Sequence, residues 1–575
     1  MTDASESPRS PARPWRARAL AILVIPVLLL VACVQVPSSG PVETGDEVAG
    51  ALDAEFFFVP DGPAAEATQE EILRGFLAAA TGAQNNYRIA RSFLAEQTAT
   101  TWNPQASALV RAREGSVTRD DDDTLRYAAP IIAAVDAFGR YSSAEGGVQE
   151  LEPFDFVEVD GEWRIAAVGD GIVLSQQEFP SAFSQHTLHW FDPSFANLVP
   201  DLRWFPSRSE VATSIVQALL DVPPPWLDEA VVSALPEGAL LGLSTVEVTE
   251  GEARVDLTGE VLSLTNDARQ RLRQQLTSSL RTVSGVASVS ITVDRNPISI
   301  LGDPTVGPAV VPQVDARLLL RADDQFGYAG GGGLDALPGI SAAVIELEAD
   351  AVALSVKQRL AAIRTAAGVS VLREGSDEAV LLDARPGMVE PAIDGLGVVW
   401  SASADAATPA SGGLRVSLID GTAQAVETGL GVGDRLISIS ISRDDARVLL
   451  LLDGSAGPRL VVAAVLRDEA TGLPVRLGSL ETLPVLEGTP IAAAWVDPVR
   501  VAAIVITDDS AVVQLVEVGG RVRSLGRPTD AVQIVGGNNG VEGLRVRDSA
   551  GLVLEPRGSG WQSTGREALF LGVQQ

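Results

Sequence analysis

The stretch SRDDARVL, residues 442–449, decides the fold of the C-terminal half of the chain, because related stretches recur on both sides of it. The similar stretches are SVKQRLAA at 355–362, WVDPVRVAA at 495–503 and, at related spacing, GVVW at 397–400 and GLRV at 543–546. Their period is about 40–50 residues, which is typical of the four-stranded blades of a β-propeller. Residues 304–575 are therefore predicted to form an all-β propeller of about six blades.

Residues 181–303, which precede the propeller, show a mixed pattern of strands and helices. Strand-like runs come before a first helix, for which Ser207 and Glu210 have the spacing of a capping box. A Glu-Gly turn marks a hairpin, and Asn266 is expected to cap the second helix before a closing strand of alternating valine and isoleucine. The order β-α-β-β-α-β predicts a compact two-layer α+β domain.

Residues 54–180 are predicted to form another α+β domain with its helices first. Thr68 and Glu71 have the spacing of a capping box, and apolar residues at helical intervals follow from Ile72 to Ala80. Asp160-Gly161 lies between two strand-like runs and predicts a two-residue hairpin turn. Helices followed by a curved antiparallel sheet resemble the cystatin-like or NTF2-like fold.

Leu30-Val31-Ala32-Cys33 ends an apolar run that follows four arginines, which is the pattern of a secretory signal. The run is shorter than the roughly 20 apolar residues that span a membrane. Cys33 is the only cysteine, and LVAC resembles a bacterial lipobox. A buried thiol fits less well, because polar, Pro- and Gly-bearing residues follow it. We expect residues 1–32 to be a signal peptide, Cys33 to become an N-palmitoyl and S-diacylglycerol cysteine, and residues 33–53 to be a tether.

The charge of the chain limits its partners. The whole chain carries 43 Lys+Arg against 75 Asp+Glu. Removal of residues 1–32 takes away four Arg, one Asp and one Glu, which leaves 39 against 73 and a net charge of −34. So acidic a surface repels phosphate backbones and anionic headgroups. Nucleic acid is thus excluded as a partner, and the lipid is expected to hold the protein to the cell membrane on its extracytoplasmic side.

The supply of catalytic groups is thin. The two histidines, His186 and His189, lie three residues apart, so they would not share a strand face, and no cysteine pair completes a zinc set. We interpret both as surface or strand-edge residues. No nucleophile elbow is present, and Lys357, the lone lysine, follows no phosphate-binding glycine loop.

Three other features have structural interpretations. Gly330–Gly333 is expected to be a connection near the start of the propeller, and Gly429-x-Gly431-x-Gly433 departs from the dinucleotide fingerprint and leads into a strand. Asp120–Asp123 is expected to be a solvated loop, since calcium loops space their ligands apart. Trp226, after three prolines, is either an exposed interaction anchor or part of loop packing. We predict no catalytic, cofactor-binding or metal site.

The order of these parts carries a family resemblance. It rests on the lipobox at Cys33, on ILRGFLAA at 72–79 with ARSFL at 90–94, on a middle domain with LVP at 198–200 and LPEG at 235–238, and on the C-terminal propeller. Together they resemble the actinobacterial LpqB lipoprotein family, whose middle domain is of the GerMN (sporulation and germination) type. The resemblance implies an accessory of the MtrA–MtrB two-component system that acts on the extracytoplasmic part of the sensor histidine kinase and affects cell-wall homeostasis and division.

Two functions stay open at this point. The first is a non-enzymatic lipoprotein that modulates a membrane sensor kinase. The alternative is an envelope carbohydrate-binding protein or glycan-acting enzyme that contacts peptidoglycan and uses the propeller. A cluster of Asp or Glu with Trp at the centre of the propeller would favour the alternative.

Overall fold

The computed structural model describes residues 61–575, except 83–84, 145, 208–209, 304–305, 377, 405–412, 432 and 455–456. Residues 59–575 form one compact unit. The predicted signal peptide, Cys33 and the tether lie outside the described residues. Among the described helices, none combines the length and the apolar composition that a membrane span requires.

The N-terminal domain packs three helices against an eight-stranded sheet ordered β7-β6-β3-β1-β8, with β2, β4 and β5 also paired to β3. Its helices are α2 (Gln69–Ala79), α3 (Arg88–Ser92) and α4 (Glu96–Thr101). Its strands are β1 (Ser107–Arg111), β2 (Ser116–Arg119), β3 (Thr124–Asp136), β4 (Tyr141–Ser143), β5 (Val148–Glu150), β6 (Phe154–Val159), β7 (Glu162–Ala167) and β8 (Ile172–Ser175). The predicted α+β architecture is confirmed.

Local signals explain this domain well. Thr68 caps α2 through the predicted capping box, in which its hydroxyl accepts from the Glu71 backbone N–H and Glu71 reaches back to the Thr68 N–H. The predicted apolar face of α2 is buried. The β6–β7 turn places Asp160 and Gly161 at φ of 54° and 80°, which the Asp-Gly sequence tolerates.

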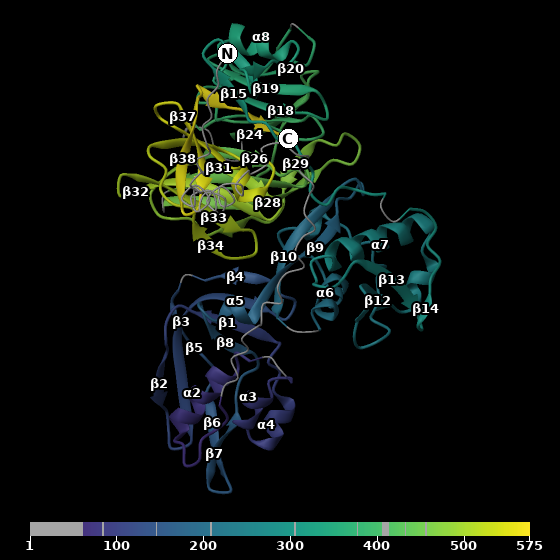
Figure 1. Ribbon diagram of the computed structural model, residues 1–575, viewed down its shortest axis with the longest axis vertical. Helices are drawn as coiled ribbons and strands as arrows, with labels where there is room; N and C mark the ends of the chain where they lie inside the picture. Colours follow the sequence, from purple (N-terminus) through teal and green to yellow (C-terminus); the bar gives the residue numbers. More distant parts are fainter. Residues whose placement is uncertain are drawn as a thin grey trace, which may run out of the picture. The chain divides into compact units, whose positions relative to one another are not determined.

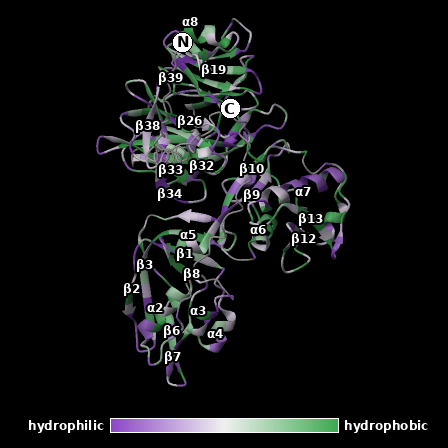
Figure 2. Cartoon of the chain, viewed as in Figure 1, coloured by the Kyte–Doolittle hydropathy of each residue, from purple (hydrophilic) through white to green (hydrophobic). Residues whose placement is uncertain are grey.

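The middle domain follows a short helix, α5 (Phe179–Ala182), and contains two sheets. A hairpin of β9 (Phe183–Phe191) and β10 (Leu198–Pro206) forms the first, and β11-β12-β13-β14 the second. The remaining elements are α6 (Val211–Leu220), η1 (Asp228–Ala230), β11 (Glu247–Thr249), β12 (Glu252–Asp256), η2 (Gly259–Ser263), α7 (Asn266–Leu280), β13 (Ser288–Val293) and β14 (Asn296–Pro297). From β10 to β13 the order is the predicted β-α-β-β-α-β. Hydrophilic residues dominate α7 (Figure 2).

Both predicted caps of this domain are wrong. The first helix begins at Val211 with Glu210 at its N-cap, because Ser207 still donates its backbone N–H to the Ala182 carbonyl as a continuation of β10. The second helix is capped by Thr265, whose hydroxyl accepts from the Ala268 N–H. Asn266 lies one residue inside, and its side chain binds the backbone of Leu301 instead.

The C-terminal domain is a closed ring of six blades, each a sheet of four or five strands (Figure 1). In chain order, the first blade contains β15 (Leu319–Ala322), β16 (Gln325–Ala329) and β17 (Leu334–Asp335), and the second contains β18 (Ala351–Ser355), β19 (Leu360–Thr365), β20 (Gly368–Arg373) and β21 (Val380–Asp383). The third contains β22 (Ala392–Ile393), β23 (Val399–Ala402), β24 (Leu414–Ser417) and β25 (Ala423–Ala425), and the fourth contains β26 (Arg435–Ile441), β27 (Arg447–Gly454), β28 (Gly457–Arg467), β29 (Pro474–Leu477) and β30 (Glu481–Leu483). The fifth contains β31 (Thr489–Asp497), β32 (Arg500–Thr507), β33 (Ser510–Glu517) and β34 (Val522–Ser524), and the sixth contains β35 (Ala531–Val535), β36 (Arg545–Asp548), β37 (Leu552–Arg557) and β38 (Gly560–Glu567). One helix, α8 (Ile340–Glu346), stands between the first two blades in sequence, and η3 (Gly540–Gly543) precedes β36.

Apolar clusters close the ring. A separate buried cluster joins each blade to the next, and the last one joins β35 and β37 to Leu320 of β15. The chain end completes two blades: β39 (Phe570–Leu571) adds a strand to β15, and β40 (Val573–Gln574) pairs in parallel with β18. Figure 1 accordingly places the C-terminus close to β18.

The sequence repeat marks equivalent positions in the blades. Residues 355–362, 442–449 and 495–503 each run from the end of a blade's first strand into its second strand. The shorter segments at 397–400 and 543–546 also lead into second strands. The predicted propeller is therefore confirmed, and the repeat that predicted it is a repeat of this one connection.

A buried ion pair on β10 lies where the middle domain contacts its neighbours. Arg203 Nη2 lies 2.6 Å from Asp201 Oδ2, and both side chains are almost fully buried. Arg203 also donates to the Phe138 carbonyl of the N-terminal domain, at 2.9 Å. The next residue, Trp204, packs in the N-terminal core and donates its indole N–H to the Gly519 carbonyl of the fifth blade, at 3.1 Å.

Replacement of Asp201 by Ala is expected to lower the free energy of unfolding by about 3–5 kcal/mol, because Arg203 would stay buried without its counter-charge. Urea unfolding followed by tryptophan fluorescence measures the loss. The matched control is Glu247→Ala in the exposed Arg254–Glu247 pair of the same domain, for which we expect less than about 1 kcal/mol. Equal losses in the two variants would contradict the role given to the buried pair.

Candidate functional site

The lipidation of Cys33 stays a prediction, since Cys33 lies outside the described residues. The remaining candidates can be placed. They are the two histidines, the carboxylates at the centre of the propeller, and the cavities of the described domains.

The histidines are buried, so their interpretation as surface residues is wrong, whereas the alternative of a strand edge fits. Both lie on β9, an edge strand of the two-stranded β9–β10 sheet, and α7 packs against this strand. His186 contacts the hydroxyls of Ser184 and Thr282, at 2.9 and 3.1 Å. Burial lowers the pKa of His186 and of His189 to about 4, so both are neutral at pH 7.

Other sequence candidates have plain structural roles. Asp120–Asp123 are exposed in the turn between β2 and β3, where Asp120 pairs with Arg126 at 2.8 Å. Gly330–Gly333 form the turn between β16 and β17, and Trp226 is half-buried against the cores of the middle domain and the propeller. Across the described part of the chain, no group of three or more His, Cys, Asp or Glu side chains is placed to hold a metal ion.

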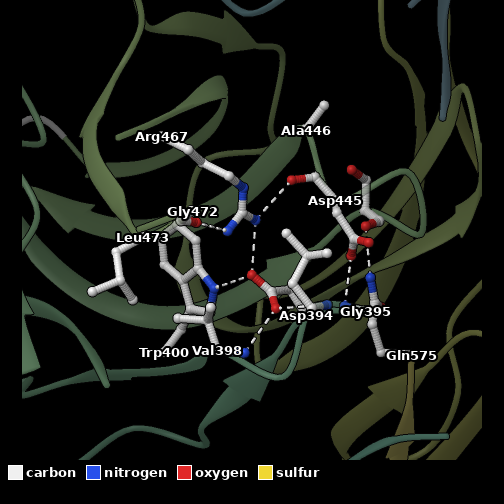
Figure 3. A network of polar contacts seen from close by, with 12 residues as sticks. Asp394, Gly395, Val398, Trp400, Asp445, Ala446, Arg467, Gly472, Leu473 and Gln575 are labelled. Carbon is white, nitrogen blue, oxygen red and sulfur yellow. Dashed lines mark hydrogen bonds and ion pairs between the residues drawn. The ribbon is translucent and has the colours of Figure 1, made fainter. Parts of the chain in front are cut away.

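The centre of the propeller contains the kind of cluster that a glycan-acting site needs, two aspartates beside a tryptophan (Figure 3). Asp394, in the turn after β22, accepts from Arg467 Nη2 at 2.7 Å, from the Val398 N–H at 2.8 Å and from the Trp400 indole at 3.4 Å. Asp394 and Trp400 are fully buried. The carboxylate is thus occupied in joining the third blade to the fourth.

Asp445 is the second carboxyl of this cluster. It accepts the Gly395 N–H at 2.6 Å and is only 7% exposed. Burial, and next the neighbouring Asp394 carboxylate, raises the pKa of Asp445 to about 6. A raised pKa beside a fixed carboxylate is the arrangement that acid–base chemistry uses. Here, however, the carboxyl has little exposed surface at which a substrate could reach it.

The chain end reaches the same cluster. The Gln575 backbone N–H donates to the Leu354 carbonyl, and its side-chain amide donates to the Ser442 carbonyl of the fourth blade at 2.6 Å. A second buried pair lies in the adjoining repeat, where Arg447 binds Asp444 at 2.5 Å, donates to the Pro498 carbonyl and stacks on Trp495. The Asp-x-x-Arg spacing of Asp444–Arg447, repeated in Asp497–Arg500, was the sequence signal for these pairs.

A cavity of about 330 Å³ opens between the first two blades. Its charged side chains are already paired: Arg317 binds Asp315 and Asp335 at 2.6 and 2.8 Å, and Arg359 binds Glu374 at 2.9 Å. The Arg317 guanidinium also covers one face of the Tyr328 ring, 4.7 Å from its centre. The aromatic face and charges that could hold a sugar are therefore engaged within the protein.

The N-terminal domain encloses a larger cavity, of about 460 Å³, between α2 and the strands β1, β5, β6 and β8. This volume falls within the roughly 300–1,000 Å³ of ordinary ligand pockets. Apolar side chains supply about half of the wall, and the polar half includes residues of β5 and of the β5–β6 and β7–β8 connections. No local pattern in the sequence predicts this cavity, because its lining comes from segments almost 100 residues apart.

Asp445→Asn is expected to alter how stability depends on pH. Because the folded pKa of Asp445 is raised from 3.8 to about 6, wild type loses stability as pH rises through 6, by up to about 3 kcal/mol, whereas Asn keeps the Gly395 hydrogen bond without a charge. The buried histidines act with the opposite sign, so the quantity to follow is the difference between variant and wild type. Urea unfolding at pH 4 and pH 7.5 should show the variant gaining on wild type, and a difference independent of pH would refute the raised pKa.

Three family models match the chain in order. They are "Lipoprotein LpqB, N-terminal domain" at residues 62–180, "Sporulation and spore germination" at residues 187–299, and "Lipoprotein LpqB beta-propeller domain" at residues 324–568. Among solved structures, the first GerMN domain of the sporulation protein GerM from Bacillus subtilis is 18% identical, with a TM-score of 0.18 over 22% of this chain and 92% of that one.

Curated relatives carry the same family name. Lipoprotein LpqB of Cutibacterium acnes is 27% identical over 49% of this chain and 47% of the relative, and that of Mycolicibacterium smegmatis is 28% identical over 49% and 50%. The chain thus spans about half the length of the curated relatives it matches. With the two LpqB-specific domain models on either side of the germination-type domain, the chain belongs to the LpqB lipoprotein family.

Proposed function

We propose that this chain is a lipid-anchored accessory protein on the extracytoplasmic side of the cell membrane, where it binds the extracytoplasmic part of a sensor histidine kinase. The observation that carries the proposal is the pair of LpqB domains on either side of a germination-type domain, behind a sequence that resembles a lipobox. The kinase is the MtrB partner of MtrA that the family resemblance implies, and the effect of binding is on cell-wall homeostasis and division.

The anchor is supported by the sequence before the described domains. Two or three acyl chains on Cys33 would hold the protein stably, whereas a single chain gives only marginal membrane binding. The protein needs such an anchor because residues 33–575, with a net charge of −34, are repelled by anionic headgroups. A lipid at Cys33 would place all three domains within reach of the outer part of a membrane protein.

The geometry favours binding over catalysis. In the propeller, Asp394 and Asp444 each form an ion pair with an arginine, and Asp445 is 7% exposed. The carbohydrate or glycan-acting alternative needs such side chains open to a ligand. By contrast, the N-terminal domain has a cavity of ligand size that its own side chains leave unfilled.

The proposal predicts that Cys33→Ala releases the protein from the membrane fraction and abolishes its crosslinking to the kinase in living cells. Ser39→Ala, which alters the tether and leaves the lipobox intact, is the matched control and should keep both properties. The measurement is membrane fractionation, followed by crosslinking and identification of the kinase by mass spectrometry. Membrane retention of the Cys33 variant would refute the lipid anchor, and failure to capture the kinase with wild type would refute the kinase as the partner.

A further inference from the structure

The charge of the N-terminal cavity has one sign. Three carboxylates line it, and none of its lining residues is Lys, Arg or His. We propose that this cavity binds a cationic, amphipathic segment of a protein partner, with a Lys or Arg side chain at the carboxylates and a neighbouring apolar side chain inside. The inference rests on the proposed function only in taking a protein as the ligand.

The apolar part of the site is built by buried side chains. Phe76 and Leu77 come from α2, Ala80 is the C-cap residue of this helix, and Phe154, Ile172 and Val173 come from the sheet. All six are less than a tenth exposed, so the wall is rigid core rather than mobile surface. An apolar side chain that enters would exchange water for this wall, which is favourable in proportion to the area buried.

The acidic part consists of Glu150, Glu152 and Asp170. Glu152 is exposed and makes no hydrogen bond or ion pair with any described residue. Asp170 accepts one hydrogen bond, from the Asn103 N–H at 2.8 Å. Glu150 is paired with Arg126 at 2.7 Å. Glu152 and Asp170 therefore leave a negative field at the cavity, which attracts a cation.

Two glycines hold the β7–β8 connection close to these carboxylates. A Cβ at Gly169 would lie 2.8 Å from Glu152 Oε2, and one at Gly171 would lie 2.3 Å from Ser107 Oγ. Gly171 also has a φ of +99°, which other residues rarely adopt. At Gly169 the backbone therefore approaches Glu152 so closely that a larger residue would push this side chain aside, and Gly171 fits the same connection against Ser107 of β1.

The negative charge of the cavity also limits which ligands it can bind. The chain's own residues 33–53 carry four acidic residues and no basic one, so the predicted tether would be repelled. Anionic headgroups and phosphates would be repelled for the same reason. A basic segment of another protein that also carries apolar side chains can pair with the carboxylates and contact the apolar wall. A polycation without apolar side chains can only pair with the carboxylates.

The test is fluorescence anisotropy with residues 33–575 carrying Cys33→Ser. The probe is a labelled twelve-residue peptide of alternating leucine and arginine. We expect saturable binding that weakens with added salt, and a loss of about tenfold in the double variant Glu152→Gln, Asp170→Asn. Glu158→Gln is the matched control, because Glu158 is an exposed glutamate of β6 outside the cavity lining. Both substituted residues are exposed, so circular dichroism should show unchanged folding.

Three results would overturn the inference: equal affinity in the double variant and wild type, equal affinity for a peptide with glutamate in place of arginine, or equal affinity for a peptide with serine in place of leucine. The last would mean attraction of any polycation. Crosslinking in cells separates this inference from the proposed function. If the double variant captures the kinase as well as wild type does, the cavity is not the contact, while the kinase proposal stands. If wild type binds the peptide but captures no kinase, the cavity inference stands and the kinase proposal is overturned.

Discussion

The buried pair of Asp201 and Arg203 on β10 is the interaction on which the rest of the described structure depends. A charge removed from water is costly unless it is paired and hydrogen-bonded, and here one carboxylate oxygen accepts from both Arg203 and the Trp190 indole. The same arginine reaches the Phe138 carbonyl, and Trp204 beside it reaches the fifth blade. One strand of the middle domain thus contacts both neighbouring domains, through hydrogen bonds from Arg203 and Trp204 to backbone carbonyls.

The propeller also contains aspartates and arginines that are paired inside the protein. Its recurring connection places an aspartate and an arginine three residues apart, and in the fourth blade both are buried against Trp495 and the Pro498 carbonyl. Arg467 and Asp394 join the third and fourth blades in the same way. The acidic residues that could have suggested chemistry in the propeller therefore hold neighbouring blades together.

Features set by neighbouring residues could be predicted from the sequence. The Thr68–Glu71 capping box, the Asp160-Gly161 turn and the repeat around residue 442 each depend on a few consecutive side chains. Features set by distant contacts could not. Ser207 looked like a cap but is held by the Ala182 carbonyl, and His186 and His189 looked exposed because nothing local shows that β9 is covered on both faces. The cavity was hidden for the same reason, since Phe76 and Ile172 meet only in the folded domain.

The central proposal is that the kinase contacts the N-terminal cavity and that the propeller stays unchanged on binding. Hydrogen exchange of residues 33–575, with and without the purified extracytoplasmic domain of the sensor kinase, tests this proposal most directly. We expect slower exchange in α2, β6 and the β7–β8 connection, with the six blades unaffected. Slower exchange confined to the blades, or no change anywhere, would contradict it.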